Sequence, residues 1–454
     1  MRNILVIGAG KSTGVLINYL LEKSEKEQLH ITIGDVVLEN AQKLVGDHKN
    51  ATPIKVDVFN AVERSVSIQK ADLVISMLPA RFHIKVAQDC LKLKKNLVTA
   101  SYVSPEMHAL NDQVKENGLI FLNEIGVDPG IDHMSAMQVI NRIKKEGGKM
   151  LLFESFTGGL VAPEDDDNLW KYKFTWNPRN VVTAGQGGAA KFIQEHKYKY
   201  IPYHRLFRRT EFLDVEGYGR FEAYANRNSL KYREAYGLED IATLYRGTMR
   251  RPGYSKAWNM FVQLGMTDDT YTISESEHMS YRDFVNSFLP YSPTDSVELK
   301  MRHELRIDQD DIMWEKLVEL DIFNSNKMVE LKNASPAKIL QKILEDSWTL
   351  EKGEKDMIVM YHKFGYELHG ERKQIDSTMV CLGDGKMETA MAKTVGLPLA
   401  MAALRILNKE LTTPGVQIPL QEEIYDPILK ELEDYGIRFR ESEEDYVGYN
   451  TLSL

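Results

Sequence analysis

Residues 3–14 read NILVIGAGKSTG and contain the most informative local pattern of the chain. Four apolar residues from Ile4 to Ile7 form a short β-type run that ends at a glycine. The glycines at 8, 10 and 14 have the spacing GxGxxxG, a variant of the GxGxxG loop that binds dinucleotides. In such a loop the first glycine permits a tight turn and the second lets a pyrophosphate approach the backbone at a helix N-terminus. The stretch therefore predicts a dinucleotide-binding loop between a strand and a helix.

Two other interpretations of this loop have to be weighed. Its Gly10-Lys11-Ser12 also resembles the end of a Walker A loop. That motif requires a glycine five residues before its last glycine, and this chain has Leu5 there, inside the strand. A glycine turn without any ligand is the second alternative, because turns use glycine for conformational reasons alone. The strand before the loop and the βαβ rhythm after it favour the dinucleotide.

Short apolar runs alternate with amphipathic stretches along the first 130 residues. We expect six strands in this part, at residues 3–8, 30–34, 53–56, 72–77, 96–100 and 119–123. Several of these runs are continuously apolar, as strands buried on both faces require. The pattern predicts an α/β fold with a Rossmann-like, doubly wound parallel sheet.

The pattern changes after Gly130. Strand-like runs mix with glycine, proline and aromatic residues, which predicts a second α/β layer. Apolar residues then follow helical spacings, before a strand at 356–362, a long apolar helix at 390–407 and an amphipathic helix from Glu422. The expected organisation is a dinucleotide domain of residues 1–130 completed by 390–454, a second α/β domain of 131–254 and 351–389, and an all-helical insertion of 255–350.

Composition excludes several classes of function. The 454 residues include 57 Lys plus Arg and 66 Asp plus Glu, so the net charge of −9 argues against a nucleic-acid partner. The two cysteines cannot form a disulfide framework, and we expect Cys90 and Cys381 to be core thiols. No apolar run approaches about 20 residues, so we expect no membrane partner and a soluble, cytoplasmic protein.

Asp35 ends the second expected strand, 21 residues after Gly14. A carboxylate at this position accepts hydrogen bonds from an adenine ribose and repels a 2′-phosphate. The alternative is an ordinary aspartate that starts a turn. We interpret Asp35 as a ribose ligand, which favours NAD over NADP, although NADP is possible. The predicted dinucleotide site consists of Gly8, Ala9, Gly10, Lys11, Ser12, Asp35, Asp57, Val58, Leu78 and Ala100.

Residues 123–133, NEIGVDPGIDH, resemble the NEIGLDPGIDH signature of saccharopine dehydrogenases of the glutamate-forming type. Further matches cover nearly the whole chain, at 72–79 (DLVISMLP), 98–105 (VTASYVSP), 158–176 (GGLVAPEDDDNLWKYKFTW), 227–229 (RNS), 244–250 (LYRGTMR), 353–364 and 390–398. The resemblance implies an oxidoreductase of lysine metabolism that interconverts saccharopine with L-glutamate and α-aminoadipate semialdehyde through an imine. It also implies a nicotinamide cofactor and a homodimer, with the second α/β domain serving substrate binding and dimerisation.

The resemblance also implies the residues of the substrate site. Saccharopine carries three carboxylates, which guanidinium groups and backbone N–H groups bind well. The implied substrate contacts are Ser101, Tyr102, Asp128, Arg227, Arg246, Gly247 and Thr248. Asp128 would hold the substrate ammonium or accept the amine proton, unless it is only a turn carboxylate before Pro129. We name Asp128 and Tyr102 as candidate catalytic residues.

The chain departs from its relatives at two positions. Many relatives carry a cysteine where this chain has Thr157, which leaves a water molecule, Tyr102, Asp128 or Lys173 to move the proton. Relatives that use NADP tend to have an arginine where this chain has Val36, which again favours NAD.

The remaining acidic and histidine residues of these motifs are not expected to bind a metal or to take part in catalysis. The acidic run 164–167 lacks the ligand spacing of a cation site, so we expect no metal. His83 and His133 lie in matched motifs, and we expect them to support loops.

Two alternative functions stay open. One is a related amine reductase such as a carboxynorspermidine dehydrogenase, against which Arg227 and Arg246 weigh because its substrate has fewer carboxylates. The other is a catalytically silent dinucleotide-sensing protein, against which the intact substrate motifs weigh. The length leaves no room for a fused lysine–ketoglutarate reductase, so we expect such a partner reaction on a separate chain.

Overall fold

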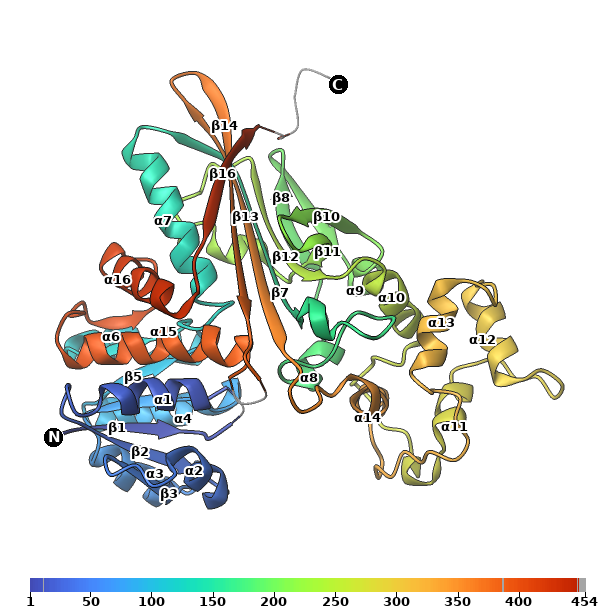
Figure 1. Ribbon diagram of the computed structural model, residues 1–454, viewed down its shortest axis with the longest axis horizontal. Helices are drawn as coiled ribbons and strands as arrows, with labels where there is room; N and C mark the ends of the chain where they lie inside the picture. Colours follow the sequence, from blue (N-terminus) through green and yellow to red (C-terminus); the bar gives the residue numbers. More distant parts are fainter. Residues whose placement is uncertain (11, 386–387, 447, 449–454) are drawn as a thin grey trace. The chain divides into compact units, whose positions relative to one another are not determined.

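The computed structural model describes residues 1–10, 12–385, 388–446 and 448 (Figure 1). The chain forms two compact units. The first consists of residues 1–150, 366–372 and 379–442, and the second of 151–365, 373–378 and the described residues from 443 onward. The first unit therefore extends beyond the expected boundary at residue 130, and it includes parts of the segment 351–389 that we assigned to the second domain.

The first unit is built on a seven-stranded parallel sheet. Its strands, in spatial order, are β15 (Gly415–Gln417), β6 (Ile120–Leu122), β5 (Asn96–Thr99), β4 (Leu73–Ser76), β1 (Arg2–Ile7), β2 (Leu29–Asp35) and β3 (Ala51–Lys55). The six strands expected in the first 130 residues are present, and the doubly wound parallel sheet is confirmed. Every residue of β4 and β6 is buried, which explains the continuous apolar runs.

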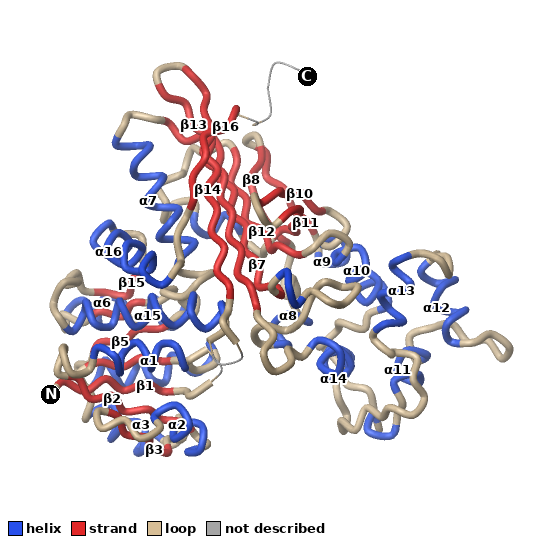
Figure 2. Tube along the Cα trace, viewed as in Figure 1, coloured by secondary structure: helices blue, strands red, loops and turns tan. Residues whose placement is uncertain are grey.

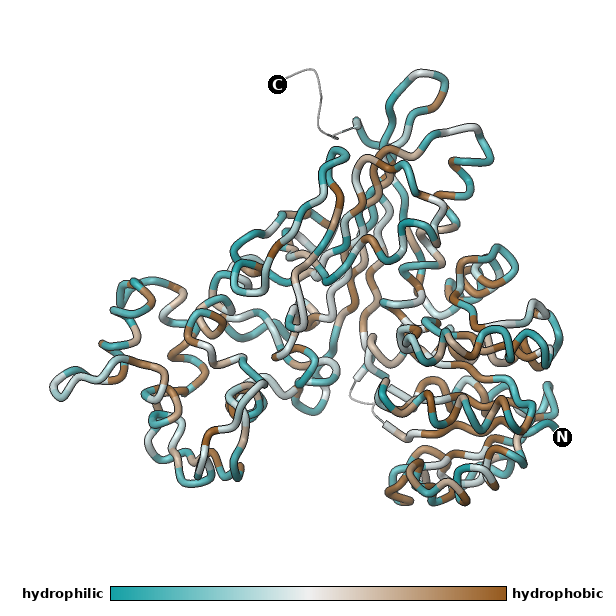
Figure 3. The backbone as a smooth tube through the Cα atoms, turned by 180° about the vertical axis from the view of Figure 1, so that it is seen from behind, coloured by the Kyte–Doolittle hydropathy of each residue, from teal (hydrophilic) through white to brown (hydrophobic). Residues whose placement is uncertain are grey.

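Helices pack against this sheet and against one another. The helices of the unit are α1 (Gly14–Lys23), α2 (Leu38–Val45), α3 (Ala61–Gln69), α4 (His83–Lys92), α5 (Pro105–His108), α6 (Asn111–Glu116), α7 (Ile131–Lys145), α15 (Ala390–Leu407) and α16 (Glu422–Leu432), with 3-10 turns η1 (Ala80–Phe82) and η5 (Glu433–Tyr435). Figure 3 shows hydrophobic residues within the layers of this unit and hydrophilic ones in its outer turns.

The helix α15 packs directly on α1. A Cβ atom added at Gly396 would lie 3.0 Å from the backbone nitrogen of Leu16, so glycine is what permits the two helices to approach closely. By length and composition α15 could cross a membrane, but 72% of it is buried inside the protein, as in the core helix of a globular unit.

The second unit contains most of a nine-stranded mixed sheet (Figure 2). Its main path runs β10 (Thr210–Val215), β11 (Gly219–Ala225), β12 (Thr243–Arg250), β7 (Lys149–Val161), β13 (Asp356–Leu368), β14 (Glu371–Leu382) and β16 (Arg440–Asp445). A hairpin of β8 (Ala190–Gln194) and β9 (Lys197–Ile201) joins this path at β12. The strand β12 runs parallel to β7 and antiparallel to β11.

Between residues 254 and 348 the elements are helical. They are α10 (Tyr254–Leu264), η4 (Ser276–His278), α11 (Tyr281–Asn286), α12 (Val297–Leu305), α13 (Ile312–Glu319) and α14 (Pro336–Trp348). The shorter elements η2 (Pro163–Asp165), α8 (Pro178–Val182), α9 (Tyr203–Leu206) and η3 (Ser229–Tyr232) precede them in the unit. Three buried tryptophans join this helical segment to the rest of the unit, since the ring of Trp348 lies 5.1 Å from that of Trp170 and 6.2 Å from that of Trp258.

Candidate active site

The loop between β1 and α1 has the geometry of a phosphate-binding turn. Gly8 has a φ of +106°, and a Cβ there would lie 2.8 Å from the carbonyl oxygen of Met77, so the fold itself requires glycine. At Gly10 a Cβ would meet nothing within 4 Å among the described atoms. Among the residues that the structure describes, no contact therefore calls for glycine at position 10, which leaves that side of the loop open to a ligand. The predicted contact Lys11 lies outside the described residues.

The start of α1 is suited to an anion. The hydroxyl of Thr13 donates to the carbonyl of Gly8 over 3.1 Å, so it does not cap the helix. The first turn of α1 carries no acidic residue, and Ser12 is half-buried beside it. Uncapped N–H groups and the positive end of the helix dipole together favour a phosphate. The loop thus fits the pyrophosphate of a dinucleotide.

Asp35 links the glycine loop to the end of β2. Its Oδ2 accepts a hydrogen bond from the backbone N–H of Ala9 over 2.8 Å, and its Oδ1 accepts one from Val37 over 2.9 Å. The carboxylate is half-buried, and the neighbouring Val36 is 57% exposed. Each carboxylate oxygen has a second lone pair, so Asp35 can hold the loop and still accept from a ribose.

The remaining predicted dinucleotide contacts follow the ends of their strands. Asp57 Oδ1 accepts from the N–H of Phe59 over 2.9 Å, in the turn after β3. Val58 is buried, and its carbonyl accepts from the guanidinium of Arg64. Leu78 is half-buried after β4. Ala100, after β5, lies so close to the 123–133 loop that a Cβ at Gly126 would be 3.0 Å from its methyl carbon.

The two candidate catalytic residues meet at the same edge of this sheet. The hydroxyl of Tyr102 donates to Oδ1 of Asp128 over 3.3 Å. Tyr102 is 41% exposed and Asp128 is half-buried. Ser101 lies next to Tyr102 and accepts, at its carbonyl, the N–H of Glu124 over 3.1 Å. The structure therefore brings Ser101, Tyr102 and Asp128 together in the first unit, beyond the carboxyl ends of β5 and β6.

The motif 123–133 forms the tight loop that presents Asp128. A Cβ at Gly130 would lie 2.1 Å from the carbonyl oxygen of Gly126, so no other residue fits there. Glu124 is buried, accepts from the N–H of Val103 over 2.9 Å, and lies 3.0 Å from Nε2 of His133. His133 thus contacts the loop from within, as expected of a residue that supports it.

In the second unit, β12 presents the predicted carboxylate ligands. Because side chains alternate along a strand, Arg246 and Thr248 point to one face and Gly247 marks the other. On that other face a Cβ at Gly247 would lie 2.8 Å from the ring of Phe156. The guanidinium of Arg246 lies 4.8 Å from the ring centre of Tyr232, and its backbone N–H donates to Ser229 Oγ over 2.9 Å.

Arg227 has an unusual backbone conformation. Its φ of +40° lies in the left-handed region that non-glycine residues adopt with strain. Its carbonyl accepts from the N–H of Lys191 over 2.7 Å, which fixes the turn between β11 and η3. The side chain is exposed, and within the described ranges its guanidinium has no hydrogen-bond or ion-pair partner.

Thr157 lies in register with Thr248, on the adjacent strand β7. Paired residues of parallel strands share a face, so both hydroxyls lie on the face that carries Arg246. The Oγ1 of Thr157 is buried and makes no hydrogen bond to the part of the chain that is described. A buried hydroxyl is costly without a partner, so it is suited to contact a ligand.

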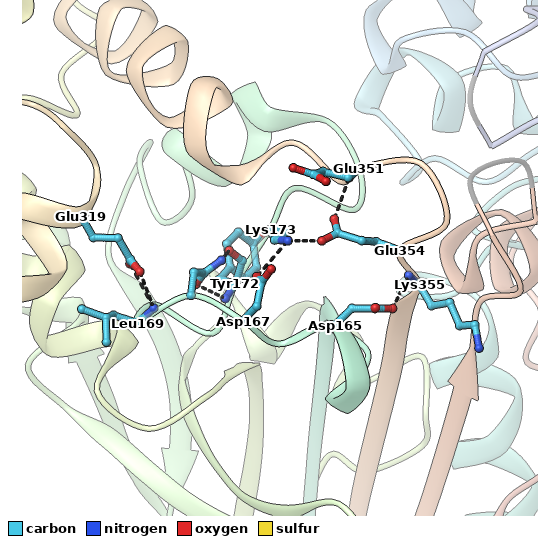
Figure 4. A network of polar contacts seen from close by, with 10 residues as sticks. Asp165, Asp167, Leu169, Tyr172, Lys173, Glu319, Glu351, Glu354 and Lys355 are labelled. Carbon is cyan, nitrogen blue, oxygen red and sulfur yellow. Dashed lines mark hydrogen bonds and ion pairs between the residues drawn. The ribbon is translucent and has the colours of Figure 1, made fainter.

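Lys173 does not have the properties of a proton donor. Figure 4 shows its amino group directed toward Glu354 and Asp167, and the contact with Asp167 measures 2.9 Å. Burial alone would lower the pKa of Lys173, but its hydrogen bonds to the two carboxylates outweigh burial and raise it. The lysine joins the 162–173 segment to the turn at 351–355, where the N–H of Lys355 donates to Asp165 over 2.8 Å.

No cluster of metal-ligating side chains occurs in residues 1–10, 12–385, 388–446 or 448. In the acidic run, Glu164 lies 3.4 Å from the amino group of Lys355 and Asp166 lies 3.9 Å from that of Lys171. Both cysteines are buried thiols, and burial raises the pKa of Cys90.

One part of the site was only partly anticipated. His83 was expected to support a loop, but no sequence pattern indicated that its ring lies between Ser76 and Ser101, with nitrogen to oxygen distances of 2.8 and 2.7 Å. A buried histidine between two hydroxyl-bearing strand ends could have been suspected from the positions of Ser76 and Thr99 at the ends of adjacent parallel strands.

Both parts of the chain match a known family. Residues 4–122 match the saccharopine dehydrogenase NADP binding domain, and residues 126–437 match the saccharopine dehydrogenase C-terminal domain. Saccharopine dehydrogenase (NADP+, L-glutamate-forming) of Pyricularia oryzae is 32% identical over 97% of this chain and 98% of its own length. The mitochondrial alpha-aminoadipic semialdehyde synthase of Rattus norvegicus is 34% identical, but this chain spans only 47% of it.

Solved structures agree with these matches. The apo saccharopine dehydrogenase (L-Glu forming) of Saccharomyces cerevisiae superposes with a TM-score of 0.88 at 30% identity, covering 98% of this chain and all of the other. A homospermidine synthase of Legionella pneumophila, at 10% identity and a TM-score of 0.54, covers 98% of this chain and 92% of its own and shares the fold alone. By sequence along nearly its whole length and by structure, this chain belongs to the saccharopine dehydrogenase family.

Proposed function

We propose that this protein oxidises saccharopine to L-glutamate and α-aminoadipate semialdehyde with a nicotinamide dinucleotide, and catalyses the reverse reaction. The observation that carries the proposal is the contact between Tyr102 and Asp128, at the edge of the sheet where the dinucleotide loop lies. Relatives of nearly the same length are named for this reaction.

The reaction requires two transfers from the substrate. The secondary amine loses a proton from nitrogen, and the adjacent carbon of the lysine skeleton loses a hydride, which leaves an imine. The bound nicotinamide supplies the hydride acceptor. Water adds to the imine carbon, and breaking of the C–N bond then releases the amino group of glutamate and the aldehyde.

Asp128 has the chemistry to handle the proton. The hydroxyl of Tyr102 donates to its carboxylate, which orients the group. An ionised carboxylate can hold the substrate ammonium or accept its proton before the hydride leaves. Lys173 is held by two carboxylates, and the Tyr102 hydroxyl already donates to Asp128. Thr157 cannot titrate near neutral pH, so we assign the proton transfer to Asp128, directly or through water.

Arg227 and Arg246 are proposed to bind substrate carboxylates. Arg227 carries an exposed guanidinium on a strained, fixed turn, and none of the described side chains pairs with it. Thr248 and Thr157 add hydroxyls on the strand face that presents Arg246. Guanidinium forks suit carboxylates better than lysine does, because they can donate two parallel hydrogen bonds.

The proposed cofactor is NAD. The relatives' names and the family description specify NADP, but Asp35 carries a negative charge at the end of β2, and the next residue is an exposed valine instead of an arginine. A carboxylate there accepts from a 2′-hydroxyl and repels a 2′-phosphate.

One assay tests the function. The purified protein is incubated with saccharopine or, separately, with carboxynorspermidine, each with either NAD or NADP, and the absorbance of the reduced nicotinamide is followed. We expect turnover with saccharopine, faster at low NAD than at low NADP. Turnover of carboxynorspermidine alone would instead identify the related amine reductase. Binding of NAD without turnover of either amine would identify a dinucleotide sensor.

A cytoplasmic location and a homodimer stay predictions. The dimer rests on the family resemblance, and sedimentation of the purified protein would test it.

A further inference from the structure

A buried histidine contacts Ser101 from beneath the proposed substrate loop. His83, the first residue of α4, is 5% exposed. Its Nδ1 lies 2.8 Å from Ser76 Oγ, and its Nε2 lies 2.7 Å from Ser101 Oγ and 3.2 Å from Thr99 Oγ1. Ser76 and Thr99 are register partners at the ends of β4 and β5, so their hydroxyls share one face of the sheet. The imidazole thus connects the sheet to Ser101.

The ring is neutral at ordinary pH. Burial lowers the pKa of His83 to about 4, and none of its hydrogen-bond partners is a carboxylate that could favour the charged form. A neutral imidazole has one N–H donor and one bare nitrogen that accepts. The position of this single proton decides the direction of both hydrogen bonds.

Ser76 determines which nitrogen carries the proton. Ser76 is 1% exposed, and within the described part of the chain its hydroxyl has a single partner, Nδ1 of His83. If Nδ1 carried the proton, the buried Ser76 hydroxyl would have no acceptor for its own hydrogen, which is costly. The favourable arrangement has Ser76 donating to a bare Nδ1, with the proton of His83 on Nε2.

This arrangement sets the polarity of Ser101. An N–H at Nε2 donates to Ser101 Oγ, and the nearby Thr99 Oγ1 can share it. The buried Thr99 hydroxyl can then direct its own hydrogen at the bare Nδ1, 3.5 Å away. The hydroxyl of Ser101 then accepts a hydrogen bond from His83 and does not donate one to it. Ser101 is half-buried, so this hydrogen can be directed at a ligand. With the opposite tautomer Ser101 would donate to His83 and present only lone pairs, which would repel a carboxylate.

We propose that His83 is a positioning residue whose Nε2–H orients Ser101 so that the Ser101 hydroxyl donates a hydrogen bond to a carboxylate of the substrate. The proposal rests on the proposed function, because it takes the ligand of Ser101 to be the anionic amine described above. The tautomer of His83 would then contribute to substrate specificity, because with the opposite tautomer Ser101 would present an acceptor suited to an ammonium group.

A double-mutant cycle tests whether His83 acts through Ser101. We expect Ser101→Ala to raise the KM for saccharopine about tenfold or more, as loss of a hydrogen bond to a charged group does, with a smaller effect on kcat. His83→Leu should raise KM similarly, and should add less than about twofold when Ser101 is already alanine. His83→Gln, which keeps an N–H donor near the position of Nε2, should recover most of the affinity.

The tautomer is measured separately, without turnover. The ¹⁵N chemical shifts of histidine in the wild-type protein at pH 7 should show His83 protonated at Nε2, and the signal should be absent from His83→Gln. A proton on Nδ1 would overturn the proposal. The proposal would also be overturned if the effects of His83→Leu and Ser101→Ala on KM multiplied in an active, folded double mutant. A His83→Gln variant whose KM for saccharopine is as high as that of His83→Leu would overturn it as well. Failure of the wild-type protein to oxidise saccharopine would instead refute the proposed function.

Discussion

The hydroxyl of Tyr102 donates to the carboxylate of Asp128 over 3.3 Å, from two different loops of one parallel sheet. We expect Asp128→Asn to lower kcat/KM for saccharopine by about 10²- to 10⁴-fold, because the amide keeps the shape and loses the base. Tyr102→Phe should cost less, since it removes only the donor that orients the carboxylate. Steady-state kinetics at saturating NAD measure both. An Asp128→Asn variant with unchanged kcat/KM would show that Asp128 is only a turn residue.

The two glycines of the dinucleotide loop should respond differently to alanine. Gly8→Ala should lower the free energy of unfolding by more than about 1–2 kcal/mol, because its φ is +106° and the new methyl would meet Met77. Gly10→Ala should leave stability equal or slightly higher, since the methyl enters open space. The same variant should weaken dinucleotide binding about tenfold or more. Thermal unfolding and calorimetric titration separate the two effects, and a Gly10→Ala protein with normal affinity would argue against a phosphate at this loop.

Asp35 should discriminate between the two cofactors. Asp35→Ala removes the ribose acceptor and also the acceptor of the Ala9 and Val37 N–H groups, so both cofactors should bind more weakly. The loss should be about tenfold greater for NAD than for NADP. Asp35→Asn is the closer control, because its amide oxygen can still accept from Ala9 while the charge and the bond from Val37 are lost. This variant should raise the affinity for NADP relative to the affinity for NAD. Equal changes in the two affinities would contradict the role of Asp35 as a ribose ligand.

Arg227 should affect substrate binding without changing cofactor binding. Arg227→Ala should raise the KM for saccharopine about 10- to 100-fold and leave the Kd for NAD within about twofold. Arg227→Gly separates the charge from the backbone, because glycine adopts a φ of +40° without strain. The glycine variant should lose the same affinity but unfold at a higher temperature than the alanine variant. A normal KM for saccharopine in both variants would show that Arg227 is a solvent-exposed charge that does not bind the substrate.

The stability of the protein should depend on pH through His83. Its pKa is lowered from 6.5 to about 4 in the folded protein, so only the unfolded chain takes up this proton between those values. Its contribution to stability is therefore fully present above pH 6.5 and declines by about 3 kcal/mol as pH falls to 4. Urea unfolding of wild type and His83→Gln at pH 7, 5.5 and 4.5 isolates this contribution. Parallel pH curves for the two proteins would show that the ring is already charged or exposed.

Much of the first unit could be predicted because its signals are local. A strand buried on both faces must be continuously apolar, and residues 4–7 of β1 and 73–75 of β4 follow this rule. The strand β15 has only three residues, of which one is buried, so it carries no periodicity to detect. The helix α7 belongs to the first unit through contacts with α16, such as the 3.0 Å bond between Asn141 and Tyr425, which no local pattern encodes.

The sequence allowed the residues of the site to be predicted from their type and motif, but it did not allow the contacts between them to be predicted. The resemblance named Tyr102 and Asp128, yet their hydrogen bond depends on how the loops after β5 and β6 leave the sheet. Thr157 was noted as a departure from the family, while its alignment with Thr248 follows from the register of β7 and β12. A lone lysine in a sequence does not reveal what pairs with it, so the two carboxylate partners that exclude Lys173 as the proton donor are visible only in the structure.

The packing of α15 on α1 has a consequence for the order in which the protein is made. The dinucleotide loop and the first six strands leave the ribosome early, but the helix that covers α1 and the seventh strand come from residues 390–417. The hydrogen bond from the guanidinium of Arg2 to the carbonyl of Leu407, 3.1 Å long, likewise forms only after residue 407 has been synthesised. The second sheet up to β14 is therefore synthesised before α15 and β15 can complete the dinucleotide-binding unit.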